Sequence, residues 1–177
     1  MNTLHTPRCT LEPQVEAHAV AMFDVLSDPA IYEFEGGPPA SVERLAASFR
    51  FKEGRLSPDG QEQWLNWVVR LPSGQLAGYV QATVLRSGVS YVAYELSSAH
   101  WRQGLGSAAV RAMLGELTRS HGVHTFVAVL KRVNFRSMGL LRHLGFEPGS
   151  PTDAQQYEAE ADEAVMVKAA NALGAAA

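Results

Sequence analysis

Residues 100–107 read H-W-R-Q-G-L-G-S and lie between two patterned runs of the chain. The run before them, V-S-Y-V-A-Y-E-L at 89–96, is rich in the β-branched and aromatic residues that favour strands. The run after them carries apolar residues at helical spacing. A helix that starts here has unpaired N–H groups and the positive end of its dipole at the turn. The stretch is therefore either a tight strand-to-helix turn or a cradle for a phosphate.

The elements around this turn predict a β-α-β unit. The pattern indicates a strand over 89–97, a helix over 104–121 and a nearly continuous apolar strand over 123–130. A crossover helix between two strands implies that the strands are parallel neighbours, and the apolar strand is typical of a buried central position. A helix over 134–144 follows, with Gly145 placed to end it.

The rest of the chain adds mostly antiparallel structure. We expect a short strand at 8–11 and helices at 14–26 and 41–51. Strands at 63–71 and 76–85 join the strand at 89–97 in a meander. A further strand begins at Phe146, and the last strand spans 162–169. The predicted order is β-α-α-β-β-β-α-β-α-β-β. This is an α/β (α+β) mixed sheet, mostly antiparallel with a central parallel pair, with helices on both faces. We expect one domain over 1–177, with a core of about 8–168 and a loose tail at 170–177.

Composition excludes several function classes. The 177 residues are 46% hydrophobic, enough for one compact core, and the formal net charge of -3 gives no basic field for nucleic acid. The chain has no apolar run long enough for a membrane span and no secretory signal pattern at its N-terminus. The single cysteine suits a reducing cytoplasm, where we expect the protein to be. His121 and His124 have no partners at ligand spacing, so no metal is expected.

A second signal lies downstream, where residues 134–146 read N-F-R-S-M-G-L-L-R-H-L-G-F. Asn134 stands at a strand-to-helix junction, where it either caps the helix or offers its amide to a ligand. Ligands of open α/β sheets bind in the crevice at the carboxyl ends of the strands, which is where both signals fall.

Together the two stretches resemble the GCN5-related N-acetyltransferase (GNAT) superfamily, whose acyl-CoA motif is [QR]-x-x-G-x-[GA]. Here Gly104 and Gly106 match, and Trp101 takes the first position. That departure resembles the ribosomal-protein-alanine N-acetyltransferase-like (RimJ/RimL-type) branch, which also carries the downstream pattern N-x-x-S-x-x-L-L-x-x-L-G-F. The matching residues are Asn134, Ser137, Leu140, Leu141, Leu144, Gly145 and Phe146.

The resemblance implies acetyl-CoA as donor and direct transfer of the acetyl group to a primary amine, either a protein N-terminus or a small cationic amine. Pantetheine would lie between the two parallel strands, and the pyrophosphate would lie on backbone amides of the glycine turn. The implied cofactor-binding residues are Leu96, Ser97, Arg102, Gln103, Gly104, Leu105, Gly106, Ser107 and Asn134. A domain of the same kind that binds CoA without catalysis is the alternative.

Candidate catalytic residues follow on either side of the turn. Glu95 lies in an otherwise apolar strand, where an acid is costly unless paired or useful, so it is either the general base or an exposed strand residue. The resemblance implies that Ser137 protonates the leaving thiolate, because Leu141 stands where many relatives carry an acidic Tyr. Ser137 alternatively bonds the helix backbone.

The acceptor side is less well defined by the sequence. Glu33 and Glu35, in the loop after the first helix, either attract a cationic acceptor or are solvated loop charges. Exposed sheet edges are compatible with a homodimer.

Overall fold

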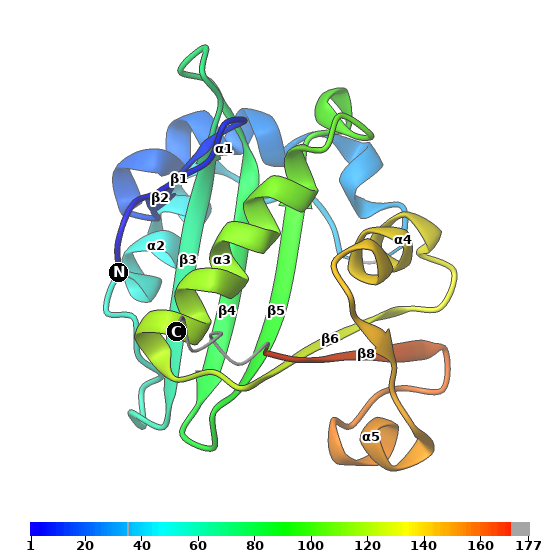
Figure 1. Cartoon of the computed structure of the whole chain (residues 1–177). Helices are drawn as coiled ribbons and strands as arrows, with labels where there is room; N and C mark the ends of the chain where they lie inside the picture. Colours follow the sequence, from blue (N-terminus) through cyan, green and yellow to red (C-terminus); the bar gives the residue numbers. More distant parts are fainter. Residues whose placement is uncertain (35, 171–177) are drawn as a thin grey trace.

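The computed structural model describes residues 1–34 and 36–170 and contains one eight-stranded mixed sheet (Figure 1). The strand order is β1-β2-β3-β4-β5-β6-β8-β7, and every neighbouring pair is antiparallel except β5 and β6. The strands are β1 (Leu4–His5), β2 (Thr10–Pro13), β3 (Glu62–Arg70), β4 (Leu76–Leu85), β5 (Val89–Leu96), β6 (Thr125–Lys131), β7 (Glu147–Pro148) and β8 (Glu163–Ala169). The predicted mixed sheet with a parallel pair is confirmed.

Helices cover both faces of this sheet, as expected. The α-helices are α1 (Ala19–Leu26), α2 (Val42–Lys52), α3 (Leu105–His121), α4 (Phe135–His143) and α5 (Pro151–Gln156), and short 3-10 helices are η1 (Glu16–His18), η2 (Pro29–Tyr32) and η3 (Ser98–His100). One buried cluster packs α1 and α2 against Val68 and Leu76, and a second packs α3 and α4 against the opposite side chains of the strands. Figure 1 shows α3 crossing one face while α1 and α2 lie behind the other.

Several boundaries differ from the sequence-based expectation. The strand expected at 8–11 is β2, two residues later, and it forms a hairpin with β1. The helix expected at 14–26 opens as η1 before α1 begins. The strand expected from 123 starts at Thr125, because the N–H of Val123 donates to the carbonyl of Leu117 and closes the end of α3.

The sequence prediction missed α5. Ser150 caps this helix by accepting from the N–H of Asp153, whose carboxylate accepts in return from Ser150. Pro151 occupies the first turn, so the chain carried a capping box that the expectation overlooked. The strand from Phe146 is therefore only the two-residue β7. Most of the tail expected at 170–177 lies outside the described residues.

The β5–β6 pairing is short relative to the strands that form it. Only Val89–Tyr91 of β5 pair with Thr125–Val127 of β6. Beyond these residues, β5 continues to Leu96 along β4, and β6 continues to Lys131 along β8. The two strands diverge, as Figure 1 shows, and leave an opening at their carboxyl ends.

Gly78 brings β4 close to β5 at the mouth of this opening. A Cβ on Gly78 would lie 2.0 Å from the carbonyl oxygen of Glu95, so no other residue fits without moving the backbone. The β3–β4 register shifts beside it, between Val69 and Arg70, as at a β-bulge. The end of β5 is thus positioned by a backbone contact that requires glycine.

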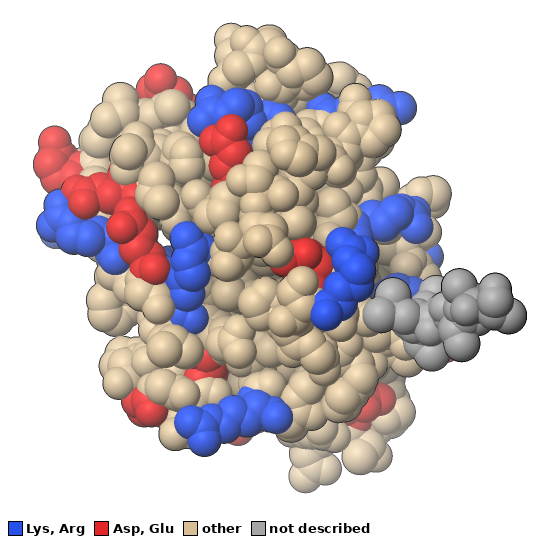
Figure 2. Space-filling model, turned by 60° about the vertical axis from the view of Figure 1, so that its left-hand side comes forward, with Lys and Arg blue, Asp and Glu red and all other residues tan. Residues whose placement is uncertain are grey.

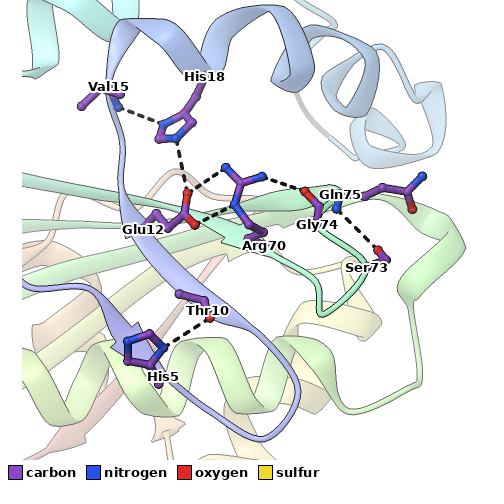
Figure 3. Close-up of polar contacts among 9 residues, drawn as sticks. All are labelled: His5, Thr10, Glu12, Val15, His18, Arg70, Ser73, Gly74 and Gln75. Carbon is purple, nitrogen blue, oxygen red and sulfur yellow. Dashed lines mark hydrogen bonds and ion pairs between the residues drawn. The ribbon is translucent and has the colours of Figure 1, made fainter.

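A polar cluster joins β2 to β3 (Figure 3). Arg70 on β3 donates from Nε and Nη2 to the carboxylate of Glu12 on β2, at 2.6 and 2.8 Å, and from Nη1 to the carbonyl of Gly74 at 2.7 Å. His18 Nε2 lies 3.5 Å from the same carboxylate, and its Nδ1 accepts from the N–H of Val15. The cluster joins β2, β3, η1 and the β3–β4 turn.

The surface shown in Figure 2 carries both signs of charge, with Lys and Arg side chains interspersed among Asp and Glu.

Replacing Glu12 by Gln should lower the free energy of unfolding at pH 7 by about 1–2 kcal/mol, because the half-buried Arg70 guanidinium loses its ionic partner. The hydrogen bonds from Arg70 hold the pKa of Glu12 below its usual 4.5, so this stabilisation is fully present above 4.5 and is lost below it, as the pH falls through the lowered pKa of the folded protein. Urea denaturation of both proteins between pH 7 and pH 4 measures the difference.

Glu16→Gln is the matched control, because Glu16 pairs with Arg50 at the solvent-exposed surface. An equal loss of stability in the two variants would contradict the role given to the Glu12 cluster. Burial also lowers the pKa of His18 from 6.5, so in the wild type a further loss of stability should begin as the pH falls below that value.

Candidate active site

A cleft of about 470 Å³ lies at the carboxyl end of β5, which diverges from β6 there, and its volume is typical of small-molecule sites. Its walls come from the loop at 30–34, the end of β5, the turn at 100–107 and the start of α4. The cleft brings together eight of the residues predicted to be catalytic or to bind the cofactor. They are Glu95, Leu96, Arg102, Gly104, Gly106, Ser107, Asn134 and Ser137.

The N-terminus of α3 opens into this cleft. Gly104 is its N-cap and has φ +77°, and Arg102 also has a positive φ of +58°. Among the described residues, no side chain caps the first turn of α3, whereas Ser41 caps α2 and Asn134 caps α4. The first amides of α3 are therefore available to an anionic ligand.

The two glycines of the turn have different roles. Gly104 supplies the left-handed backbone conformation that starts the helix. A Cβ on Gly106 would instead lie 2.7 Å from Leu140 Cδ1 and 3.2 Å from Leu96 Cδ1. Gly106 thus permits α3, α4 and β5 to pack closely, a role that the sequence did not indicate. The Leu105 side chain is buried in the core, so only its backbone faces the turn.

Arg8 reaches the same turn from the N-terminal hairpin and was missed by the sequence reasoning. Its Nη1 donates to the carbonyl of Gln103 at 3.0 Å, and its Nε would lie 3.4 Å from a Cβ on Gly104. The side chain of Gln103 donates to the carbonyl of Ala99 at 2.8 Å. Arg8 and Arg102 thus add positive charge to the N-terminal end of α3, while Gln103 helps to shape the turn.

Hydrogen bonds join the end of β5 and the residues that follow it to three neighbouring segments. Trp101 Nε1 donates to the carbonyl of Leu96 at 2.8 Å, and the N–H of Ser97 donates to the carbonyl of Ala77 at 2.9 Å. The N–H of Ser98 donates to Asp28 at 2.8 Å, and this bond is the main reason that the pKa of Asp28 is lowered. Since the N–H of Ser97 extends the β4–β5 ladder, it is already engaged by the protein itself.

Glu95 faces the side of the sheet that carries α1 and α2. It pairs in register with Tyr79, which packs in the α1–α2 cluster. Burial raises the pKa of Tyr79 well above its usual range, and the charge of Glu95 and its hydrogen bond with Tyr79 raise it further. Burial, followed by the charges of Glu95 and Asp28, raises the pKa of Tyr32 to about 12. Glu95 is therefore a partly buried carboxylate held beside phenol groups at the cleft wall.

Tyr94, the preceding residue, faces the opposite side and packs against the α3–α4 cluster. Its Oη lies 2.7 Å from Ser137 Oγ. The N–H of Ser137 donates to Asn134 Oδ1 at 3.0 Å, so Asn134 is the N-cap of α4. The Asn134 Nδ2 group is the part of that side chain able to donate to a ligand.

Glu33 is balanced by a cation within the protein. It forms an ion pair with Arg136 of α4, whose guanidinium carbon lies 4.5 Å from the Trp101 ring centroid and 5.2 Å from that of Phe34. The proposed attraction of a cationic acceptor by Glu33 therefore requires competition with Arg136. Glu35, the other acid expected there, lies outside the described residues.

Two further properties concern residues 1–34 and 36–170. No helix in these ranges is long and apolar enough to cross a membrane. Nor do these residues include a group of three or more His, Cys, Asp or Glu side chains arranged to hold a metal ion.

Comparisons with known proteins identify the family. The family model for the acetyltransferase (GNAT) domain matches residues 8–147. Among solved structures, a putative GnaT-family acetyltransferase from Bordetella pertussis has a TM-score of 0.73 at 22% identity, covering 95% of this chain and 99% of that one. RimL, a ribosomal L7/L12 α-N-protein acetyltransferase in complex with coenzyme A, has a TM-score of 0.78 at 16% identity, with coverages of 95% and 98%. Mycobacterium smegmatis RimJ in complex with CoA-disulfide has a TM-score of 0.77 at 17% identity, with coverages of 98% and 90%.

No sequence among the curated proteins matches this chain. The structural neighbours share its fold over nearly their whole length, and they include enzymes of the RimL and RimJ type to which the sequence pattern pointed. With a family model that spans most of its length, this protein belongs to the GNAT acetyltransferase family.

Proposed function

We propose that this protein transfers the acetyl group of acetyl-CoA directly to a primary amine. The observation that carries the proposal is the opening between β5 and β6, bounded by the N-terminus of α3, with Glu95 on one side and Ser137 on the other. Solved GNAT neighbours described as complexes with coenzyme A or acetyl-CoA support the choice of donor.

The cleft residues fit the chemical groups of coenzyme A. The first amides of α3, together with Arg8 and Arg102, suit the pyrophosphate. The backbone of β5 beyond Tyr91 and Asn134 Nδ2 suit the amide groups of pantetheine, since both are polar and border the cleft. The thioester, once bound, supplies an activated acyl group, so no enzyme nucleophile is needed.

Glu95 is the group best placed to accept the proton of the amine. An alkylammonium has a pKa of about 10.4 and must lose a proton before its nitrogen can attack. A carboxylate in a half-buried wall of the cleft accepts that proton directly or through one water molecule. The amine would then approach from the α1–α2 side of β5, where Glu95 lies.

The acceptor we propose is a protein N-terminal amine or a small cationic amine. RimL acts on a ribosomal protein N-terminus, whereas another neighbour of the same fold is an aminoglycoside acetyltransferase. The loop at 30–34 and Arg136 form the wall that would meet the acceptor. An assay therefore has to sample both acceptor classes.

The test measures acetyl-CoA binding and turnover separately. Acetyl-CoA should raise the melting temperature, and free thiol should be released only when an accepted amine is present. Stabilisation without thiol release from any peptide or small amine would instead support a CoA-binding domain without catalysis. Absence of stabilisation would overturn both functions.

Replacing Gly104 by Val should abolish acetyl-CoA binding while the fold is retained, because a β-branched residue strains the left-handed backbone that aims the α3 amides. Thermal shift and calorimetric titration measure this effect. Gly74→Val is the matched control, since Gly74 also has a positive φ, of +91°, but lies in the open β3–β4 turn and does not line the cleft. Undiminished binding to the Gly104 variant would show that these amides do not hold the phosphates.

Replacing Arg8 by Met should weaken acetyl-CoA binding about tenfold, the effect of losing one charged hydrogen-bond donor to a phosphate. The difference should shrink as salt is added, because screening weakens exposed charge pairs. Arg86→Met provides the comparison, since Arg86 bonds the carbonyl of Gly60 on another turn. If the two variants bind equally well, Arg8 only braces the loop.

Replacing Glu95 by Gln should lower kcat by about 10²–10⁴, the contribution of a positioned general base, and leave the Kd of acetyl-CoA nearly unchanged. Steady-state kinetics with an accepted amine, combined with donor titration, separates the two effects. Equal losses in binding and turnover would assign Glu95 a structural role.

A further inference from the structure

Tyr94 of β5 and Ser137 of α4 form a pair of hydrogen-bonded hydroxyl groups in the cleft. Tyr94 Oη lies 2.7 Å from Ser137 Oγ and 3.2 Å from the Ser137 carbonyl oxygen. Both residues line the cleft, although they lie 43 positions apart in the chain. The pair therefore exists only because the fold brings β5 and α4 together.

We propose that this pair donates a hydrogen bond to the sulfur of coenzyme A as the thioester breaks, with Tyr94 as a positioning residue that acts through Ser137. The inference rests on the proposed acetyl transfer and adds Tyr94 to it. It also gives Ser137 a specific partner.

The position of the pair follows from the sheet. The pairing of β5 with β6 ends at Tyr91 and Val127, so Tyr94 lies within the part of β5 that borders the opening. Ser137 faces it from the first turn of α4, where the helix dipole favours negative charge. A sulfur bound between these elements would develop its charge near both hydroxyl groups.

Two successive side chains of β5 point to opposite faces of the sheet, and each can serve a different atom of the reaction. Tyr94 faces the α3–α4 side and Glu95 faces the α1–α2 side. The amine nitrogen attacks one face of the thioester carbonyl and the sulfur is a separate substituent of the resulting tetrahedral carbon, so the two atoms need partners at different places. The strand therefore offers a proton acceptor for the nitrogen on one side and a hydrogen-bond donor for the sulfur on the other.

The hydrogen atoms of the pair suffice for this role. Each hydroxyl group has one hydrogen, and either oxygen can donate across the 2.7 Å contact. When Tyr94 donates to Ser137 Oγ, the Ser137 hydrogen is free to point at the sulfur. Without Tyr94, a Ser in a helix tends to bond its own backbone, so the phenol keeps the hydroxyl turned to the cleft.

The pair acts as a hydrogen-bond donor and keeps its protons, which replaces the proton transfer from Ser137 that the family resemblance implies. Burial raises the pKa of Tyr94 to about 12, an effect that the hydrogen bond with Ser137 reduces, whereas a free thiol has a pKa of about 8.5. The nitrogen lone pair forms the C–N bond, and the C–S bond breaks with its electron pair on sulfur. The proton that the ammonium group loses before attack has by then passed from Glu95 to water, so Glu95 takes the second proton of the nitrogen, and the thiolate takes a proton from water after it leaves.

The pKa of the thiol of bound coenzyme A tests the pair without any amine acceptor. The ultraviolet absorbance of the thiolate is titrated with saturating protein, for the wild type, Tyr94→Phe, Ser137→Ala and the double variant. Tyr91→Phe is the matched control, because Tyr91 lies on the same strand and contacts Tyr157 instead. Desulfo-coenzyme A, which lacks the sulfur, reports on packing alone.

We expect the bound thiol to have a pKa below about 8.5 in the wild type and in Tyr91→Phe. The thiol pKa should rise by about one unit, a tenfold loss of thiolate stabilisation, in Tyr94→Phe and in Ser137→Ala, and no further in the double variant. Affinity for desulfo-coenzyme A should be the same in all five proteins. An unchanged thiol pKa in Tyr94→Phe and Ser137→Ala would overturn the inference.

Kinetics separates this inference from the proposed function. With an accepted amine, Tyr94→Phe should lower kcat about tenfold at unchanged KM for acetyl-CoA. If no amine is acetylated by the wild type while the thiol pKa shifts as expected, the proposed function fails and the hydroxyl pair stands. If Tyr94→Phe unfolds, Ser137→Ala decides, because it keeps the Tyr94 ring in place; an unchanged thiol pKa in that variant overturns the pair.

Discussion

Backbone pairing between β5 and β6 stops at Tyr91 and Val127 although both strands continue. Beyond these residues β5 continues along β4 and β6 continues along β8, and the carboxyl end of β5 borders a cleft. Gly78 maintains this geometry, because only glycine permits β4 to approach the carbonyl of Glu95. The α3 N-terminus, the cap of α4 and the end of β5 all meet at this opening, so the candidate active site depends on where the pairing ends.

The alternation of side chains along β5 places the proposed proton acceptor and the proposed hydrogen-bond donor on opposite faces of the sheet. Glu95 lies among phenols on the α1–α2 side, and Tyr94 contacts Ser137 on the α3–α4 side. A direct transfer needs a group that accepts a proton from nitrogen and a group that stabilises charge on sulfur, with the carbonyl carbon between them. Two neighbouring residues of one strand meet this requirement because their side chains point to opposite faces.

Local pattern was enough to predict the β-α-β unit, the meander and the start of α3, because each depends on residues close in sequence. It also brought Glu95, Asn134 and Ser137 to one region, since the carboxyl ends of parallel strands share an edge. Arg8 and Tyr94 escaped prediction because their partners, Gln103 and Ser137, are distant in sequence and are set by packing. Gly106 was predicted to bind a ligand and lines the cleft, and its missing Cβ also makes room for Leu140, a packing role that depends on distant residues. Likewise, the pairing of Glu33 with Arg136 arises from the fold and is invisible to loop composition.

The central claim is that coenzyme A occupies the opening between β5 and β6 and caps α3. Amide hydrogen exchange with and without acetyl-CoA measures this directly, residue by residue. Exchange should slow on binding at residues 92–97, at the amides of 104–107 and at the start of α4. It should be unchanged around the second hollow near Gly60 and Arg86, at the other end of β4. Protection confined to that second hollow, with the α3 amides exchanging as before, would contradict the account.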